Sequence, residues 1–162
     1  MKIISAAMNG GMIPDRFGKR GSDKNSFGVP SRSIPLKIEE VPEGTKSFAL
    51  ILEDKDAAPV CGFSWIHWIA ADIMKTELPE NDSVKAKDYV QGINSWLGTY
   101  GREGALGYGG MMPPNAPHEY ELHVFALDEL LGLENGFFMN DLYQAMEGHI
   151  LEHERVKGTY DN

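Results

Sequence analysis

The chain has 162 residues, of which 42% are hydrophobic and 24% charged, and it carries a formal net charge of −9. This length and composition fit one folded domain, residues 1–162, rather than two domains or a disordered chain. Because an acidic protein repels polyanions at long range, we expect neither nucleic acid nor an anionic membrane as the main partner. With one cysteine, Cys61, no internal disulfide can form, so a reducing, cytoplasmic location is expected. No apolar run approaches the roughly 20 residues of a transmembrane helix.

Strand-like segments dominate the chain. Residues 2–8 predict a first strand. Residues 47–52 form a continuous apolar run that ends in charged residues, which suits a strand buried on both faces. Residues 65–73 are rich in aromatic and β-branched side chains, and residues 118–127 alternate with the period of a strand. A short strand at residues 158–160 is predicted to close the chain.

Loops and one helix complete the prediction. Gly10 to Pro35 shows no sustained period and is expected to run over the surface, and Gly98 to Pro117 contains six glycines and three prolines. A helix is predicted from Asp141 to Val156, with Asn140 as its N-cap. Its apolar stripe is formed by Leu142, Met146, His149, Ile150 and His153. Strands joined by long loops, with one late helix, indicate a mainly β domain with packed sheets.

Five polar residues lie in or beside the predicted strands. Asp54 and Asp56 have the spacing that places two side chains on one strand face, and so do His118 and Tyr120. His67 stands inside an aromatic and apolar strand, where a polar side chain needs a partner. Taken alone, such a histidine is more often a satisfied core residue than part of a site. Together the five residues predict a polar pocket at the strand ends.

Several short motifs carry further information. Those around the five polar residues are Asp54-Lys55-Asp56-Ala57-Ala58-Pro59, Trp65-Ile66-His67-Trp68, Gly107-Tyr108-Gly109-Gly110, Pro113-Pro114 and His118-Glu119-Tyr120. They resemble, in the same order, the motifs of the phosphatidylethanolamine-binding protein family. The segments between them are similar to its bacterial and archaeal Raf kinase inhibitor-like branch. The resemblance extends from Met1 to Tyr160, and several collinear motifs are far more specific than any one of them.

The resemblance implies an antiparallel β-sandwich with few helices and a pocket for phosphate, phosphoethanolamine or another small anion. Carried over by position, the ligand-binding residues are Asp54, Asp56, His67, Gly110 at the rim, Pro114, His118 and Tyr120. No catalytic residue, cofactor or metal is implied. The resemblance also suggests a cis peptide bond near Phe63-Ser64.

Several residues depart from the family pattern. Lys55 replaces a proline between the two aspartates and is expected to add a cation near the pocket. Glu119 replaces an arginine and should point to the opposite face. Met111 and Met112 stand where a Gly-Pro pairing is usual, which puts the shape of the rim in question.

The favoured function is non-enzymatic binding of a phosphate monoester or lipid head group. Two carboxylates repel an anion, so we expect His67 and His118 to be protonated, with pKa values raised by the aspartates. One alternative is a metal-dependent or acid–base hydrolase that uses the same residues. Another is a protein-interaction module, as in kinase-inhibitor-like relatives, with an unknown protein partner.

Two further expectations concern other parts of the chain. The run His149-Ile150-Leu151-Glu152-His153 matches the His-x-x-Glu-His pattern of some zinc proteases, but a downstream acidic ligand is lacking, and we reject that reading. A homodimer is also expected. Eukaryotic relatives have an additional C-terminal helix that partly covers the pocket region, and apolar surface left exposed there in this chain would favour self-association through a two-fold interface.

Overall fold

The computed structural model describes residues 1–162, and its three central strands follow the apolar runs of the sequence. β3 (Ser47–Asp54), β4 (Trp65–Ile73) and β7 (His118–Leu127) lie side by side in a five-stranded sheet. The edges of this sheet are β6 (Val90–Gln91) and β8 (Ile150–Tyr160), in the order β6-β4-β3-β7-β8. Every pairing in it is antiparallel.

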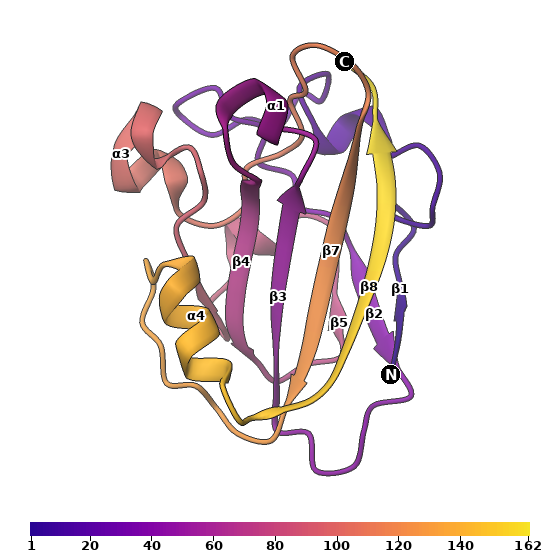
Figure 1. Ribbon diagram of the computed structural model, residues 1–162, viewed down its shortest axis with the longest axis vertical. Helices are drawn as coiled ribbons and strands as arrows, with labels where there is room; N and C mark the ends of the chain where they lie inside the picture. Colours follow the sequence, from indigo (N-terminus) through magenta and orange to yellow (C-terminus); the bar gives the residue numbers. More distant parts are fainter.

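A second antiparallel sheet packs against one face of the first (Figure 1). Its strands are β1 (Lys2–Ile4), β2 (Leu36–Glu39) and β5 (Glu77–Leu78), in the order β1-β2-β5. The mainly β fold class with two antiparallel sheets is therefore confirmed. The first strand is shorter than predicted, and the two-residue strands β5 and β6 have no signal in the sequence.

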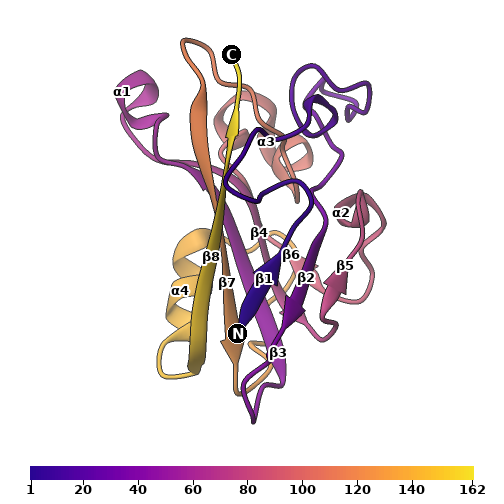
Figure 2. The same cartoon turned by 90° about the vertical axis from the view of Figure 1, so that its right-hand side faces the viewer.

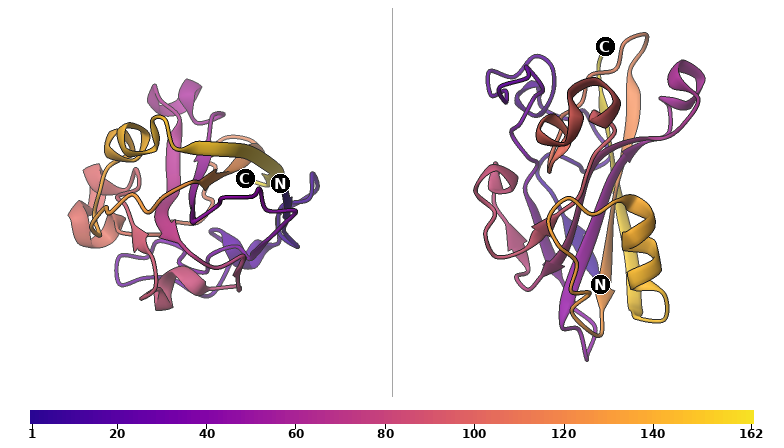
Figure 3. Two further views of the ribbon diagram at one scale, coloured as in Figure 1. Left: turned by 90° about the horizontal axis from the view of Figure 1, so that it is seen from below. Right: turned by 90° about the vertical axis from the view of Figure 1, so that its left-hand side faces the viewer.

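Both faces of the large sheet are covered, which explains why β3 is apolar at nearly every position. The even-numbered side chains of β3 and β7, such as Leu50 and Leu122, join the core between the two sheets. The odd-numbered ones, such as Ile51 and Phe125, pack on the outer face with Leu142 and other residues of and near α4 (Met139–Met146). Figures 2 and 3 show this order of layers: α4, the large sheet and the small sheet.

The predicted helix at 141–156 is wrong in its second half. α4 ends at Met146, Gly148 has a φ of 83°, and β8 begins at Ile150. The segment also alternates, and a full-length partner strand, β7, is available from His118 to Leu127. Pairing with that strand outweighs the helical spacing of the apolar residues, because propensity is only a weak guide against tertiary contacts.

Short helices occupy three connections, of which only the last falls in a segment that was predicted as a loop. They are α1 (Ala58–Cys61), α2 (Asp82–Lys85) and α3 (Leu97–Ala105), and a 3₁₀ turn covers Asp15–Phe17. α3 lies inside the glycine-rich segment and is kinked at Gly101, where φ is 67°. This helix was not predicted because its glycines have low helix propensity. No helix combines the length and apolar character needed to cross a bilayer.

The segment from Gly10 to Pro35 does not simply run over the surface, as predicted. Ile13, Phe17 and Ile34 are buried in the core between the sheets. Gly18 carries no side chain because a Cβ there would lie 2.6 Å from the Met111 carbonyl oxygen. The loop is therefore fixed against the segment that leads to β7.

Candidate functional site

The antiparallel order of the large sheet builds a site at one end of the molecule. The C-terminal end of β3 lies between the start of β4 and the start of β7, with Asp54 opposite Trp65 on one side and Tyr120 on the other. α1 caps the connection from β3 to β4 at this end (Figure 1). A cavity of about 230 Å³ opens here, lined by Asp54, Ala57, Val60, Cys61, Trp65, His67, Trp96, Met112, Pro114, His118 and Tyr120.

Five of the seven residues predicted for the site line this cavity, namely Asp54, His67, Pro114, His118 and Tyr120. Asp56 and Gly110 do not. Asp56 is exposed beyond the end of β3, and its carboxylate accepts a hydrogen bond from the backbone N–H of Glu119 at 2.9 Å. Gly110 is packed against backbone: a Cβ there would lie 2.3 Å from the Phe17 carbonyl oxygen.

Asp54 and His118 form a buried pair on one wall of the cavity. Asp54 is 3% exposed and His118 is 2% exposed, and the carboxylate Oδ2 lies 2.7 Å from Nδ1 of the imidazole. The second carboxylate oxygen accepts a hydrogen bond from the backbone N–H of Ala57 at 3.1 Å, which ties down the start of α1. The other ring nitrogen, Nε2, lies 3.0 Å from the side-chain amide of Asn115. The pair is thus held on both sides.

His67 has a different environment, with consequences for its protonation. Its Nδ1 lies 2.5 Å from the Gly109 carbonyl oxygen, which can only accept, so Nδ1 carries a proton. Burial lowers the pKa of His67, and this outweighs the hydrogen bond to the Gly109 carbonyl and the charge of Asp54, which both raise it. The neighbouring aspartate thus acts in the predicted direction, but burial reverses the net shift. In its neutral form, His67 presents an unprotonated Nε2.

Two buried donors beside the cavity have no hydrogen-bond partner. The indole Nε1 of Trp96 is buried without a partner, and the buried hydroxyl of Tyr120 lies beside the Asp54 carboxylate without a well-aligned hydrogen bond. Burial, and then the neighbouring Asp54 carboxylate, raise the pKa of Tyr120 far above its usual value, so the hydroxyl keeps its proton. An unpaired buried donor costs free energy in the ligand-free protein, and such groups commonly mark a place that a ligand or water fills.

The apolar wall of the cavity was missed from the sequence. Trp65 and Trp96 meet edge to face with ring centroids 5.0 Å apart, and Val60 and Met112 complete this side. Trp65 has a signal in the sequence, since it belongs to the same aromatic strand as His67. Cys61 also lines the cavity, at the end of α1, with its thiol directed to the carbonyl oxygens of Ala57 and Phe63.

Two expectations about the surroundings of the site are corrected. Lys55 adds no cation to the cavity, because its ammonium lies 2.7 Å from Glu121, whose side chain is on the outer face of the sheet. The structure contains no cis peptide bond, so the one expected near Phe63-Ser64 is absent. The turn into β4 is made instead by Gly62, which has a φ of 91° and ends α1.

Comparison with known proteins gives relatives over nearly the whole chain. The uncharacterized protein YxkA of Bacillus subtilis is 41% identical over 153 residues, which cover 90% of this chain and 91% of the relative. A UPF0098 protein of Chlamydia trachomatis is 34% identical over 166 residues and 99% of both chains.

Solved structures agree with the sequence relatives. The crystal structure of a putative phosphatidylethanolamine-binding protein homologue from Chlamydia trachomatis has a TM-score of 0.80 at 33% identity, over 99% of this chain and 96% of that one. Escherichia coli YbcL, described as a member of the mammalian family, shares the fold with a TM-score of 0.80 at 23% identity, over 99% and 98% of the two chains. The family model for the phosphatidylethanolamine-binding proteins matches residues 4–161. The chain therefore belongs to the phosphatidylethanolamine-binding protein family.

Proposed function

We propose that the cavity beside Asp54 and His118 binds a small anion, a phosphate monoester or phospholipid head group, without transforming it. The observation that carries the proposal is the pair of buried, unpaired donors, the Tyr120 hydroxyl and the Trp96 indole N–H. Both belong to residues that line the cavity, and a phosphoryl oxygen can accept from either.

The cavity can accommodate an anion if His67 takes up a proton when the anion binds. Asp54 carries the negative charge of the site, but His118 occupies one of its oxygens and Ala57 the other. An anion therefore does not face a bare carboxylate. Neutral His67 cannot donate from Nε2, because its single proton is on Nδ1. Once it takes up a second proton, it becomes a cation that can donate to the anion.

The apolar wall says what kind of molecule carries the anion. Trp65, Trp96, Val60 and Met112 offer carbon surface and, apart from the indoles, no hydrogen-bonding groups. A phosphate monoester would bury its short organic group against the two indoles, whereas inorganic phosphate would leave the indoles exposed to water. Phosphoethanolamine is therefore expected to bind more tightly than inorganic phosphate.

Anion binding is expected to weaken as pH rises, and to take up a proton. Because the pKa of His67 is lowered in the free protein, the neutral form dominates at pH 7. Binding of the anion is therefore coupled to uptake of one proton by His67. Affinity should fall by up to about tenfold per pH unit between pH 6 and 8 for one coupled proton. Titrating phosphoethanolamine by calorimetry, in buffers of different ionisation enthalpy, measures the number of protons that the protein takes up on binding.

The control for that experiment is a pair of substitutions in the same cavity. His118→Ala should weaken binding, whereas Cys61→Ala should leave it nearly unchanged, because the thiol is already turned to two backbone carbonyls. An affinity that does not change with pH, or that both variants reduce equally, would mean that the imidazoles do not hold the anion.

The homodimer stays a prediction. Its support is exposed apolar side chains at this end of the molecule: Val60 is 49% exposed and lines the cavity with Met112, and Phe63 is 51% exposed and stacks on Trp65. Sedimentation of the wild-type protein at tens of micromolar should give twice the chain mass of 18.0 kDa. A single 18.0 kDa species would contradict the prediction.

A further inference from the structure

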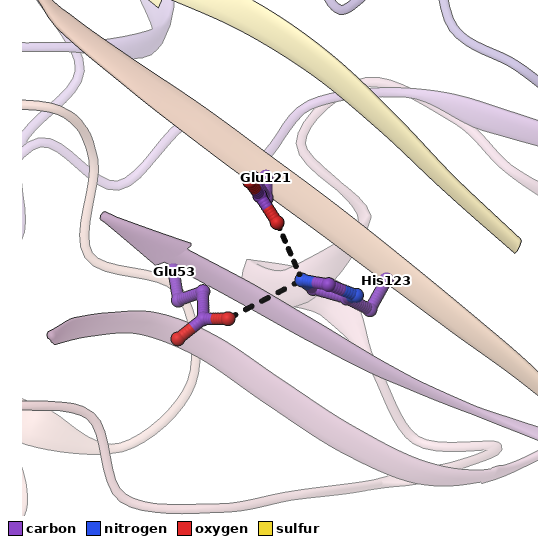
Figure 4. A group of neighbouring side chains, drawn as sticks. All are labelled: Glu53, Glu121 and His123. Carbon is purple, nitrogen blue, oxygen red and sulfur yellow. Dashed lines mark ion pairs between the residues drawn. The ribbon is translucent and has the colours of Figure 1, made fainter. Parts of the chain in front are cut away.

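A second cluster of ionisable side chains lies on the outer face of the large sheet, opposite the cavity side. Glu53 of β3 stands directly across from Glu121 of β7, and His123 lies two residues farther along β7 on the same face. Figure 4 shows the imidazole of His123 directed toward the two carboxylates. None of these residues contributes to the cavity, although Glu53 is next in sequence to Asp54.

The distances in this cluster match those between the ligands of a metal ion. Nε2 of His123 lies 3.2 Å from Oε1 of Glu53 and 3.2 Å from Oε2 of Glu121, and all three atoms lie within 4.8 Å of one another. Around a tetrahedral Zn²⁺ with ligands at about 2.0–2.2 Å, two ligand atoms are about 3.3 Å apart. The second oxygen of Glu53 is held by the Ser64 hydroxyl at 2.7 Å, and Oε1 faces the centre of the cluster, with the Lys55 ammonium 3.4 Å away.

His123 is the observation that sets this cluster apart from a group of surface acids. The residue is only 9% exposed, and its buried Nε2 lies at ion-pair distance from both carboxylates but makes no well-aligned hydrogen bond to either. Its other nitrogen, Nδ1, lies 3.0 Å from Nε2 of His153 on the neighbouring strand.

The pairing of the two imidazoles has a direct consequence. If His123 donates its Nδ1 proton to His153, its Nε2 lone pair faces two negative carboxylates, an arrangement that either a second proton on His123 or a metal ion between the three groups stabilises. Metal-binding histidines commonly donate their second ring N–H to an acceptor in this way. The ring of His153 is itself fixed by stacking on Phe125, with centroids 4.4 Å apart.

We propose that Glu53, Glu121 and His123 bind one divalent transition-metal ion of the zinc type, with a fourth position open to water. Two carboxylates and one imidazole are suitable ligands for such an ion. The ion would join β3 to β7 one residue away from Asp54.

Basic side chains compete for the same carboxylates. Lys55 lies 2.7 Å and Arg155 3.0 Å from Oε2 of Glu121, and Lys157 lies 3.1 Å from its other oxygen. Lys55 and Arg155 are about half exposed, so both can turn out to solvent when an ion enters. Removing Lys55 should therefore strengthen metal binding, a result that no purely structural ion-pair network predicts.

The test is a calorimetric titration of Zn²⁺ into protein first freed of metal with a chelator. Wild type is expected to bind one Zn²⁺ per chain. His123→Gln should abolish this binding, His153→Phe should weaken it by about 10- to 100-fold, and Lys55→Met should tighten it. His149→Gln is the matched control, because that imidazole contacts other carboxylates, of Asp128 and Glu129, and should change nothing.

Several outcomes would overturn the proposal. Wild type that binds no Zn²⁺ would show that His123 is a protonated bridge between the carboxylates. Binding that survives His123→Gln but is lost in His118→Gln would place the ion in the cavity instead. If His123→Gln does not fold, Glu53→Gln takes its place, since the Glu53 side chain is more exposed than that of His123. The visible spectrum of the Co²⁺-loaded protein gives a second readout, which should report tetrahedral geometry in wild type and lose it in the variant.

Discussion

Replacing Asp54 with alanine is expected to lower the free energy of unfolding by about 1–3 kcal/mol for each buried donor that loses its acceptor. The carboxylate is almost fully buried, accepts from His118 and holds the backbone N–H of Ala57. Its loss leaves both donors without an acceptor, in a place that water reaches poorly. Urea denaturation followed by circular dichroism gives the change in stability.

Asp56 offers a matched control two residues away. It is exposed and accepts one backbone hydrogen bond, from Glu119, so Asp56→Ala should cost only about 1 kcal/mol. Equal losses in the two variants would contradict the view that Asp54, and not Asp56, organises the cavity. The comparison also separates two aspartates that the sequence motif treats alike.

Gly110→Ala is expected to destabilise the protein by about 1–3 kcal/mol without changing the intrinsic affinity of the cavity for an anion. A Cβ at Gly110 would lie 2.3 Å from the Phe17 carbonyl oxygen and 2.8 Å from Cβ of Pro30. The clash can be relieved only if the loop that packs against Gly110 moves, so the substitution should lower the free energy of unfolding. Thermal unfolding and phosphoethanolamine titration of the same sample measure the two effects separately.

Gly98→Ala is the control for this substitution. Gly98 lies in α3 and a Cβ there meets nothing within 4 Å, so alanine should stabilise the helix by up to about 1 kcal/mol. A Gly110→Ala variant as stable as wild type but unable to bind the anion would restore Gly110 to the rim of the site, as first predicted from the motif.

The strands that the sequence predicts well are those whose signal is local. β4 and β7 have the predicted bounds, because β4 is rich in aromatic and β-branched residues and β7 alternates with the period of a strand. Of β8 only the last three residues, 158–160, were predicted as a strand, since the earlier ones also fit a helical stripe and only the partner strand β7 decides between the two. α3 could not be predicted either, because its glycines have low helix propensity.

The site divides in a similar way. Residues on paired strand ends, such as His67 and His118, could be placed from the motif spacing and the period of a strand. The apolar wall could not, because Trp96 and Met112 reach the cavity from loops with no regular period. Charge states also escaped prediction: the pKa of His67 depends on depth of burial, and the direction of Lys55 depends on a carboxylate 66 residues away.

The central claim is that the Tyr120 hydroxyl, buried and unpaired, is a donor kept for an anion, and Tyr120→Phe tests it most directly. The variant removes one oxygen and keeps the packing, so stability should change by less than about 1 kcal/mol, because the hydroxyl makes no well-aligned hydrogen bond in the free protein. Calorimetric titration with phosphoethanolamine at pH 6.5 should show about 10-fold or greater weakening, since a hydrogen bond to a charged group contributes about 1.5–3 kcal/mol. Equal affinity in wild type and Tyr120→Phe, or no binding by wild type at millimolar ligand, would contradict the account.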